Sequence, residues 1–234
     1  MNWQVTAVGN AGFRIDAGPR RIFIDAFYRP LPGVADPPAR SVWDVSRADL
    51  ILVTHDHPDH FEPALTSSVA HRMGAVVVGS QRVVETLRQF DRTVRCFGVE
   101  PGQESHPGGL LSREVHAAGI TLCAFRTSHG SDHLSWLGSC EDGFRFLHDG
   151  DNEDTSRYTP QDTGALDALF IAPWLGSGWA QAIRRLSPAR WFLMHLTAAE
   201  IDAHEKGAYL PELCDSVPPG VVCLRPGKRY SPES

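Results

Sequence analysis

Short apolar runs bounded by glycine and proline recur throughout the chain, and they limit the folds open to it. In many of them apolar and polar residues alternate, which is the pattern of a strand with one buried face. Residues 50–53, LILV, are apolar throughout, as expected of a strand covered on both faces. The predicted strands are 3–8, 12–17, 21–27, 49–54, 74–79, 94–99, 113–119, 119–127, 144–148, 167–174, 190–195 and 221–226.

Apolar residues also recur at helical spacing between several of these strands. Leu65 and Val69 belong to such a series and predict a helix over about 59–73. Further helices are predicted at 81–90, 179–186 and 198–206. Strands therefore cluster early and alternate with helices later, which favours two mixed sheets packed together with helices on the outer faces. We expect one domain over residues 1–234.

The composition restricts the partners and the compartment of the chain. Its 234 residues are 42% hydrophobic, which is enough for a sizeable core, and its formal net charge is -6. That acidic balance disfavours a nucleic-acid partner, because phosphate binding requires a basic face. Five cysteines without a CxxC pair predict no disulfide framework and suit a reducing cytoplasm. No signal-peptide pattern opens the sequence, and no apolar run is long enough to span a membrane.

Side chains capable of binding metal follow four of the apolar runs. His55 follows LILVT, His129 follows LCAFRTS, Asp151 follows FRFLHDG, and His195 follows WFLM. A side chain at the end of a buried strand sits on a rigid element, as a preorganised site requires. The four runs therefore predict a metal site assembled from distant segments.

The sequence HDHPDH carries a spacing argument of its own. Residues two apart in an extended segment point to the same side, about 6.5–7 Å apart at Cα, so His55 and His57 can reach one ion together. Pro58 stiffens the next turn, after which Asp59 and His60 can face a second ion. Imidazole and carboxylate ligands without cysteine suit zinc most, and manganese or iron are compatible. The alternative is a solvated polar turn that is rich in histidine.

These motifs together resemble one known family. THDHPDH matches the HxHxDH signature of the metallo-β-lactamase superfamily. TAVGNAGFRI and RIFIDAF resemble the opening of the branch that includes ascorbate-phosphate lactonase-like and other metal-dependent hydrolases, and TSHG, HDGDNED and MHLT resemble its later ligand motifs. The resemblance covers most of the chain and implies an α+β fold, a four-layer αβ/βα sandwich.

The resemblance also implies a ligand set for two divalent metal ions. The first ion would take His55, His57 and His129, the second would take Asp59, His60 and His195, and Asp151 would bridge both. A hydroxide between the ions would be the nucleophile, with Asp59 and Asp151 as the catalytic residues. The family often has histidine where this chain has Asn10, so a supporting hydrogen bond is expected to differ there.

Several nearby residues leave alternatives open. Asp149 has the same strand parity as Asp151, although only Asp151 follows a glycine as in the family's GD motif. Asp25 either orients a ligand histidine or ends a strand in a turn. His133 is interpreted as a surface histidine, with substrate contact or proton donation to the leaving group as the alternative. His148 either packs beside the site or pairs in the sheet.

Substrate selection is expected to depend on loops and aromatic residues. The proline-rich segment 29–40 predicts a surface loop that overhangs the site, and Trp43 and the segment after TSH are expected to contribute. Trp174, Trp179 and Tyr158 either line a pocket or pack in the core, and core packing is the default for the tryptophans.

The leading functional hypothesis is a binuclear metal-dependent hydrolase that cleaves a small-molecule ester, lactone or phosphoester. One alternative is a phosphodiesterase or nuclease with the same signature. Others are a non-catalytic, metal-dependent ligand-binding protein and di-iron oxygen chemistry. We expect a cytoplasmic protein with a small-molecule substrate and no membrane partner, and a homo-oligomer is compatible with the sequence.

Overall fold

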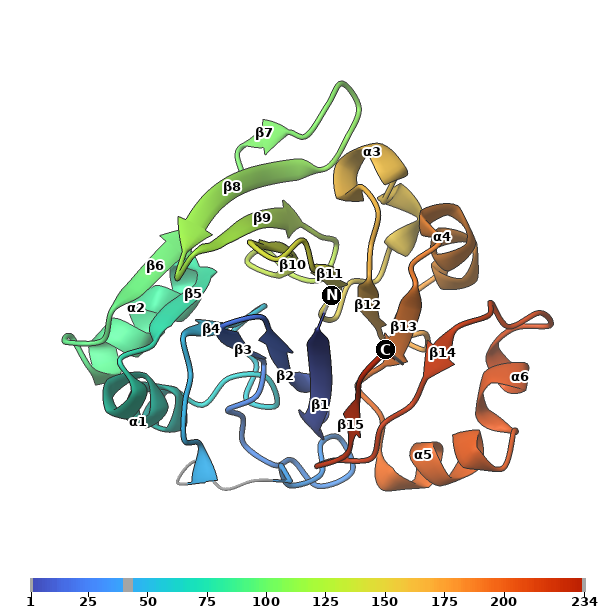
Figure 1. The fold of residues 1–234 in the computed structure, drawn as a ribbon, viewed down its shortest axis with the longest axis horizontal. Coiled ribbons are helices and arrows are strands. Elements are labelled where there is room, and N and C mark those ends of the chain that lie inside the picture. Colours follow the sequence, from blue (N-terminus) through green and yellow to red (C-terminus); the bar gives the residue numbers. More distant parts are fainter. Residues whose placement is uncertain (1, 40–43, 233–234) are drawn as a thin grey trace.

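Two mixed β-sheets pack face to face in the computed structural model, which describes residues 2–39 and 44–232 (Figure 1). Within this described part, the first sheet has seven strands in the order β15-β1-β2-β3-β4-β5-β6, and the second has eight in the order β14-β13-β12-β11-β10-β9-β8-β7. The strands of the first sheet are β1 (Trp3–Gly9), β2 (Gly12–Ala17), β3 (Arg20–Ile24), β4 (Leu50–Leu52), β5 (Val76–Ser80), β6 (Cys96–Val99) and β15 (Arg229–Tyr230). Those of the second are β7 (Gln103–Glu104), β8 (Leu111–Ala117), β9 (Ile120–Arg126), β10 (Leu134–Cys140), β11 (Arg145–His148), β12 (Ala168–Ile171), β13 (Arg190–Leu193) and β14 (Val221–Val222).

Helices cover the outer face of each sheet. Buried side chains of α1 (Pro63–Met73) and α2 (Gln81–Phe90) pack against the first sheet. Those of α4 (Trp179–Leu186), α5 (Ala198–Glu205) and α6 (Tyr209–Leu213) pack against the second (Figure 1). A short α3 (Pro160–Thr163) follows a 3₁₀ turn at Thr155–Arg157. The αβ/βα sandwich expected from the resemblance is confirmed.

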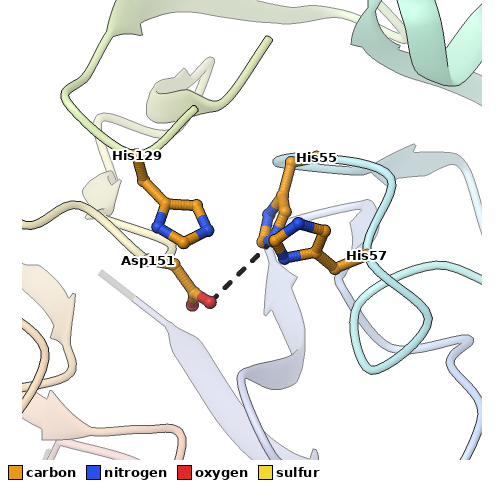
Figure 2. Close-up of side chains that lie close together, drawn as sticks. All are labelled: His55, His57, His129 and Asp151. Atoms are coloured by element: carbon orange, nitrogen blue, oxygen red, sulfur yellow. Dashed lines mark ion pairs between the residues drawn. The ribbon is translucent and has the colours of Figure 1, made fainter. Parts of the chain in front are cut away.

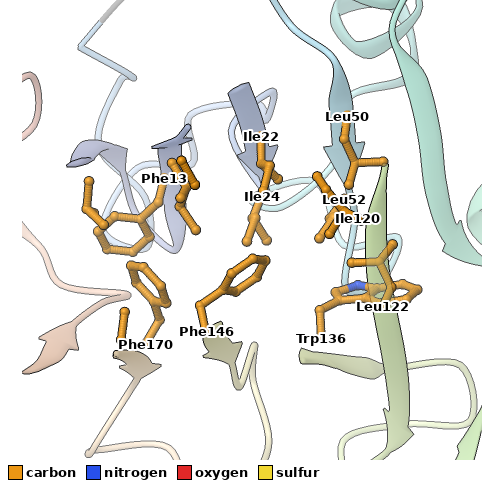
Figure 3. Close-up of a cluster of buried hydrophobic side chains, with 14 of the residues drawn as sticks. Phe13, Ile22, Ile24, Leu50, Leu52, Ile120, Leu122, Trp136, Phe146 and Phe170 are labelled. Atoms are coloured by element: carbon orange, nitrogen blue, oxygen red, sulfur yellow. The ribbon is translucent and has the colours of Figure 1, made fainter. Parts of the chain in front are cut away.

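The core between the sheets is aromatic and aliphatic. Figure 3 shows side chains of the two sheets meeting face to face. Phe13 of the first sheet and Phe170 of the second have ring centroids 4.7 Å apart, and Phe170 stacks on Phe192 at 4.9 Å. Each such ring contributes roughly 1.5–3 kcal/mol through burial, so this layer holds the two sheets in one relative position.

Strand direction brings the predicted ligand-bearing ends to one edge. β11, β12 and β13 are parallel, and β9 runs the same way because both it and β11 are antiparallel to β10. The residues that follow β9, β11 and β13 therefore leave the second sheet on the same side. Two hydrogen bonds join β10 to the segment after β4, from Leu134 N to Thr54 O (3.0 Å) and from Trp136 Nε1 to Val53 O (3.1 Å).

Some predicted elements differ from the observed ones. The helix predicted from residue 59 begins at Pro63, because turns occupy the preceding residues and Glu62 caps the helix by accepting from Ala64 N. Strand β10 was missed, since serines and Gly138 interrupt its apolar pattern. Gly138 has a packing reason, because a Cβ there would overlap the ring of Phe146.

All five cysteines are free thiols in the structure, and Cys96 and Cys140 are buried. None of the described helices is long and apolar enough to cross a membrane.

Candidate metal centre

All seven predicted ligands converge at the edge where β4, β9, β11 and β13 end. One group consists of His55, His57, His129 and Asp151, and a second consists of Asp59, His60 and His195. Within each group, donor atoms lie within 4.8 Å of one another. Figure 2 shows the first group, with its three imidazoles and one carboxylate turned toward a common centre.

Asp151 lies between the two groups. Its Oδ2 is 3.8 Å from His55 Nε2 of the first group and 3.5 Å from His195 Nε2 of the second. Its Oδ1 is 3.2 Å from His60 Nε2. A carboxylate that contacts both groups has the position of a bridging ligand.

A tight turn divides HDHPDH between the two groups. The His60 and Phe61 amides donate to the carbonyl of His57 at 3.0 and 2.9 Å, which reverses the chain after Pro58. His57 is exposed and faces the first group, whereas Asp59 and His60 are buried in the second. The predicted change of direction at the proline therefore occurs.

Hydrogen bonds hold the outer nitrogens of two histidines. His60 Nδ1 donates to Asp25 Oδ2 at 2.8 Å, and the same oxygen accepts from Thr54 Oγ1 at 2.7 Å. Because the Thr54 hydroxyl hydrogen is used in this way, its oxygen accepts from His55 Nδ1 at 2.9 Å. In the neutral rings the proton is therefore on Nδ1, and each Nε2 has a free lone pair that can bind a cation. Of the two alternatives for Asp25, the structure shows the one that orients a histidine.

The other ligands have supports that the sequence did not reveal. His129 Nδ1 lies 3.0 Å from Glu153 Oε1, in the acidic run that follows Asp151. Asn10 Nδ2 donates to the carbonyl of Asp59 at 2.9 Å and to its Oδ2 at 3.3 Å. Asn10 therefore makes a supporting hydrogen bond to Asp59 at the position where the family often has histidine.

The inward-facing atoms fit a divalent cation. His55 Nε2, His60 Nε2, His129 Nε2 and Asp151 Oδ1 are buried and have no hydrogen-bond partner among the described residues. An unpartnered buried polar atom costs about 1–3 kcal/mol, so these four, which lie in two adjoining donor groups and of which His60 Nε2 and Asp151 Oδ1 are 3.2 Å apart, indicate missing positive partners. Nitrogen and oxygen donors without sulfur suit zinc, manganese or iron.

Charges in the protein without metal are already balanced within the cluster. Burial opposes the charged forms throughout, yet the neighbouring imidazoles hold the pKa of the Asp59 and Asp151 carboxyls below the usual range. Burial is likewise outweighed at His195, where hydrogen bonds to Asp151 and Asp59 raise the pKa to about 9. Burial dominates at His55 and lowers its pKa. Metal binding must therefore displace protons from some ligands and not from others.

Hydrogen bonds show which of Asp149 and Asp151 lies among the candidate ligands. Asp149 is fully buried outside the cluster, where its Oδ1 accepts from Tyr158 Oη (2.7 Å) and Asn152 Nδ2 (3.0 Å). Burial raises the pKa of Asp149 to about 7. Asp151, not Asp149, is the carboxylate at the centre.

His133 is neither the surface histidine nor the substrate-contacting one that the sequence predicts. It is 1% exposed, and its Nε2 accepts from the amide of Asp151 at 2.8 Å. Its Nδ1 donates to Thr127 Oγ1 at 2.5 Å. Both nitrogens are thus engaged inside the protein. The sequence offers no local signal for this contact, because the partners lie on different loops.

His148 packs between the two sheets. It is fully buried, its Nε2 donates to the carbonyl of Ala11 at 2.9 Å, and its ring meets Phe13 edge-on. It therefore does not take part in either donor group.

The aromatic residues divide between core and surface. Trp179 and Tyr158 are buried, as the core interpretation predicts for the tryptophan. Trp174 is 43% exposed, which contradicts that default. Its Nε1 donates to the carbonyl of His195 at 2.8 Å, and this bond turns the indole outward beside the centre.

The proline-rich segment reaches the centre, as expected. The amide of Arg29 donates to the carbonyl of Pro58 at 2.7 Å, and Gly33 and Val34 line a groove beside His195. Trp43 lies outside the described residues, so its predicted contribution stays a prediction.

Comparison with known proteins identifies the family. The model of the beta-lactamase superfamily domain matches residues 15–199. A UPF0173 metal-dependent hydrolase of Nitratidesulfovibrio vulgaris (strain DP4) is 28% identical over 157 residues, which are 64% of this chain and 59% of that protein. The chain thus spans less than two thirds of the length of that relative. A UPF0173 metal-dependent hydrolase of Methanopyrus kandleri is 27% identical over 247 residues, covering 97% of this chain and 99% of that protein.

Solved structures share the fold at low identity. A metallo hydrolase of Ignicoccus hospitalis, Igni18, has a TM-score of 0.69 at 16% identity and covers 100% of both chains. An isothiocyanate hydrolase from Delia radicum gut bacteria has a TM-score of 0.67 at 15% identity and covers 97% of this chain and 98% of its own. The family model spans most of the chain and includes the HxHxDH motif at residues 55–60. The chain therefore belongs to the metallo-β-lactamase superfamily.

Proposed function

We propose that the chain is a metal-dependent hydrolase that uses two divalent ions, with zinc the first choice, to cleave an ester, lactone or phosphoester of a small molecule. One observation carries the proposal. Two donor groups meet at Asp151, which contacts residues of both. Four of their inward atoms, His55 Nε2, His60 Nε2, His129 Nε2 and Asp151 Oδ1, are buried without a hydrogen-bond partner among the described residues.

His55, His57 and His129 would hold one ion, Asp59, His60 and His195 the other, and Asp151 both. When bound, the ions would supply a hydroxide nucleophile at neutral pH and polarise the bond under attack.

The chain's own residues would position and deprotonate the attacking water. Asp59 Oδ2 is 3.2 Å from His195 Nε2 and accepts from Asn10, so this carboxylate is held in one orientation. The two contacts fix the anionic carboxylate, which suits a residue that orients water by accepting a hydrogen bond and passes its proton on. Asp25 keeps the His60 ring in place during this transfer.

The access side of the centre supports a small substrate. His57 is exposed and His129 half-buried, whereas the residues of the second group are buried and His195 lines an adjacent groove. A reacting group would therefore approach past the first group. The net charge of -6 gives no general attraction for nucleic acid, which supports the small-molecule reading over a nuclease.

The test combines metal content with hydrolysis of matched aryl esters, lactones and phosphodiesters after loading with zinc, manganese or iron. His57→Ala and Asp151→Ala should lose bound metal and turnover together. His116→Ala, at an exposed position on β8, is the matched control and should keep both. Full turnover by metal-free Asp151→Ala would sink the proposal, and oxygen consumption by the iron-loaded protein without hydrolysis would replace it with di-iron chemistry.

A further inference from the structure

A groove of about 180 Å³ adjoins the second donor group. Its lining comes from three separate segments: Gly33 and Val34 of the proline-rich loop, Trp174, and His195 with Thr197 and Glu200. Because His195 itself lines the groove, a molecule in it would lie next to the centre. The groove is thus continuous with the site proposed for hydrolysis.

Trp174 presents only apolar surface to this groove. Its indole N–H already donates to the carbonyl of His195, and its ring meets the His195 ring edge-on with centroids 5.2 Å apart. Trp174 is 43% exposed and Val34 is 47% exposed. Large apolar side chains exposed this close to a reactive centre indicate a contact surface for a ligand.

The Thr197 groups that line the groove already form hydrogen bonds within the protein. Thr197 N and Oγ1 both donate to Glu200 Oε2 at 2.8 Å, in the capping box that starts α5. No lysine or arginine lines the groove among the described residues, and its charged group apart from His195 is the Glu200 carboxylate. Beyond His195, this surface offers no cation among the described residues to balance a phosphate, sulfate or carboxylate, and the Glu200 carboxylate disfavours an anion near it.

The size suits one ring. An apolar cavity of about 150 Å³ in another protein accepts benzene, so about 180 Å³ accommodates a phenyl group or a branched alkyl chain. Indole faces favour planar partners through offset or edge-on stacking.

We propose that this groove binds the uncharged, apolar part of the substrate, best an aromatic ring, and that Trp174 determines this specificity. The inference rests on the proposed hydrolase function and names the class of its substrate: a neutral aryl or bulky alkyl ester or lactone. Glu200 disfavours negatively charged substituents on that part of the substrate.

The test measures binding of two metal-binding probes that differ by one ring. Benzohydroxamate and acetohydroxamate are titrated into the zinc-loaded protein by calorimetry. The wild type should bind the benzo compound about tenfold more tightly. Trp174→Ala should lose this preference while keeping its affinity for acetohydroxamate and zinc. Trp174→Phe lacks the bond to His195 but retains a ring, and should keep most of the preference.

A charged probe tests the second half of the proposal. 4-Carboxybenzohydroxamate should bind more weakly than the neutral compound, and Glu200→Gln, which can still cap the helix, should recover about two- to fivefold. An unchanged tenfold preference in Trp174→Ala would overturn the groove assignment alone. Failure of both hydroxamates to bind any zinc-loaded protein would instead overturn the metal-dependent function beneath it.

Discussion

The amide of Asp151 donates a hydrogen bond to Nε2 of His133 across 2.8 Å, and this bond determines where the central carboxylate of the site sits. The donor must be the backbone N–H, so the imidazole is neutral with its proton on Nδ1, where Thr127 accepts it. Burial, which lowers the pKa of His133, favours the same neutral form. His133, which directly precedes β10, thus positions the carboxylate that contacts both groups.

Replacing His133 should loosen Asp151 without removing a ligand. His133→Ala leaves the Asp151 amide unpartnered and opens a cavity, for an expected loss of about 2–4 kcal/mol in unfolding free energy. Metal affinity should fall as well, which calorimetric titration would measure. His133→Gln can still accept the amide hydrogen bond and should recover much of the affinity. Equal metal affinity in the alanine variant would contradict a positioning role.

Gly150 should tolerate no side chain. Its φ is +61°, and a Cβ would overlap the His133 imidazole. Gly150→Ala therefore combines backbone strain of about 1 kcal/mol or more with displacement of His133. Denaturant unfolding should show the loss. Gly33→Ala, with a φ of +77° and open space around it, controls for the backbone term alone.

The two neighbouring aspartates should behave oppositely. Asp149→Asn resembles the protonated acid favoured by burial and should retain metal with a stability change of about 1 kcal/mol. Asp151→Asn removes the charge shared by both groups and should lose at least one ion. Metal counts by elemental analysis distinguish the variants, and loss of metal from Asp149→Asn with retention by Asp151→Asn would reverse the assignment.

Asp25→Asn should weaken metal binding through His60. In the carboxylate, Oδ1 accepts from Thr54 N and Oδ2 accepts from both the Thr54 hydroxyl and His60 Nδ1. An asparagine amide has one oxygen, so it cannot keep all three hydrogen bonds. Loss of a hydrogen bond that orients a ligand histidine typically lowers metal affinity by 10- to 100-fold, so we expect a loss of at least about 10-fold in this variant. Competition with a chromophoric chelator would measure it, and an unchanged affinity would show that Asp25 is only a turn residue.

Metal affinity should rise with pH because ligands carry protons in the protein without metal. The pKa of His195 is raised from 6.5 to about 9, so below pH 9 zinc competes with a proton for this imidazole. The dissociation constant for zinc should therefore fall by up to about tenfold per pH unit between pH 6.5 and 9.

The same pKa shift makes the unfolding free energy of the metal-free protein fall as the pH rises. A raised pKa gives stability that is full below pH 6.5 and is lost as the pH rises through 9. Thermal unfolding with chelator and with zinc should therefore show opposite slopes, and parallel slopes would argue against proton displacement.

The sequence alone determined most of the longer elements and the ligand types. Apolar runs and their periods are local properties of the chain, so the sequence alone predicts the strands LILVT and WFLM and the amphipathic helices. The spacing around Pro58 likewise predicts that the side chains of HDHPDH divide between two ions. Each ligand predicted in this way follows a buried strand or lies in that turn.

Only the tertiary structure decided which groups support those ligands and what surface surrounds them. His133 meets Asp151, Asp25 meets His60, and Val34 meets the groove of Trp174 because the two sheets bring separate loops to one edge. Such contacts depend on strand order and sheet packing, which have no period along the chain. For that reason the sequence predicts a surface position for His133 and a core position for Trp174, although His133 is buried and Trp174 is exposed beside the centre.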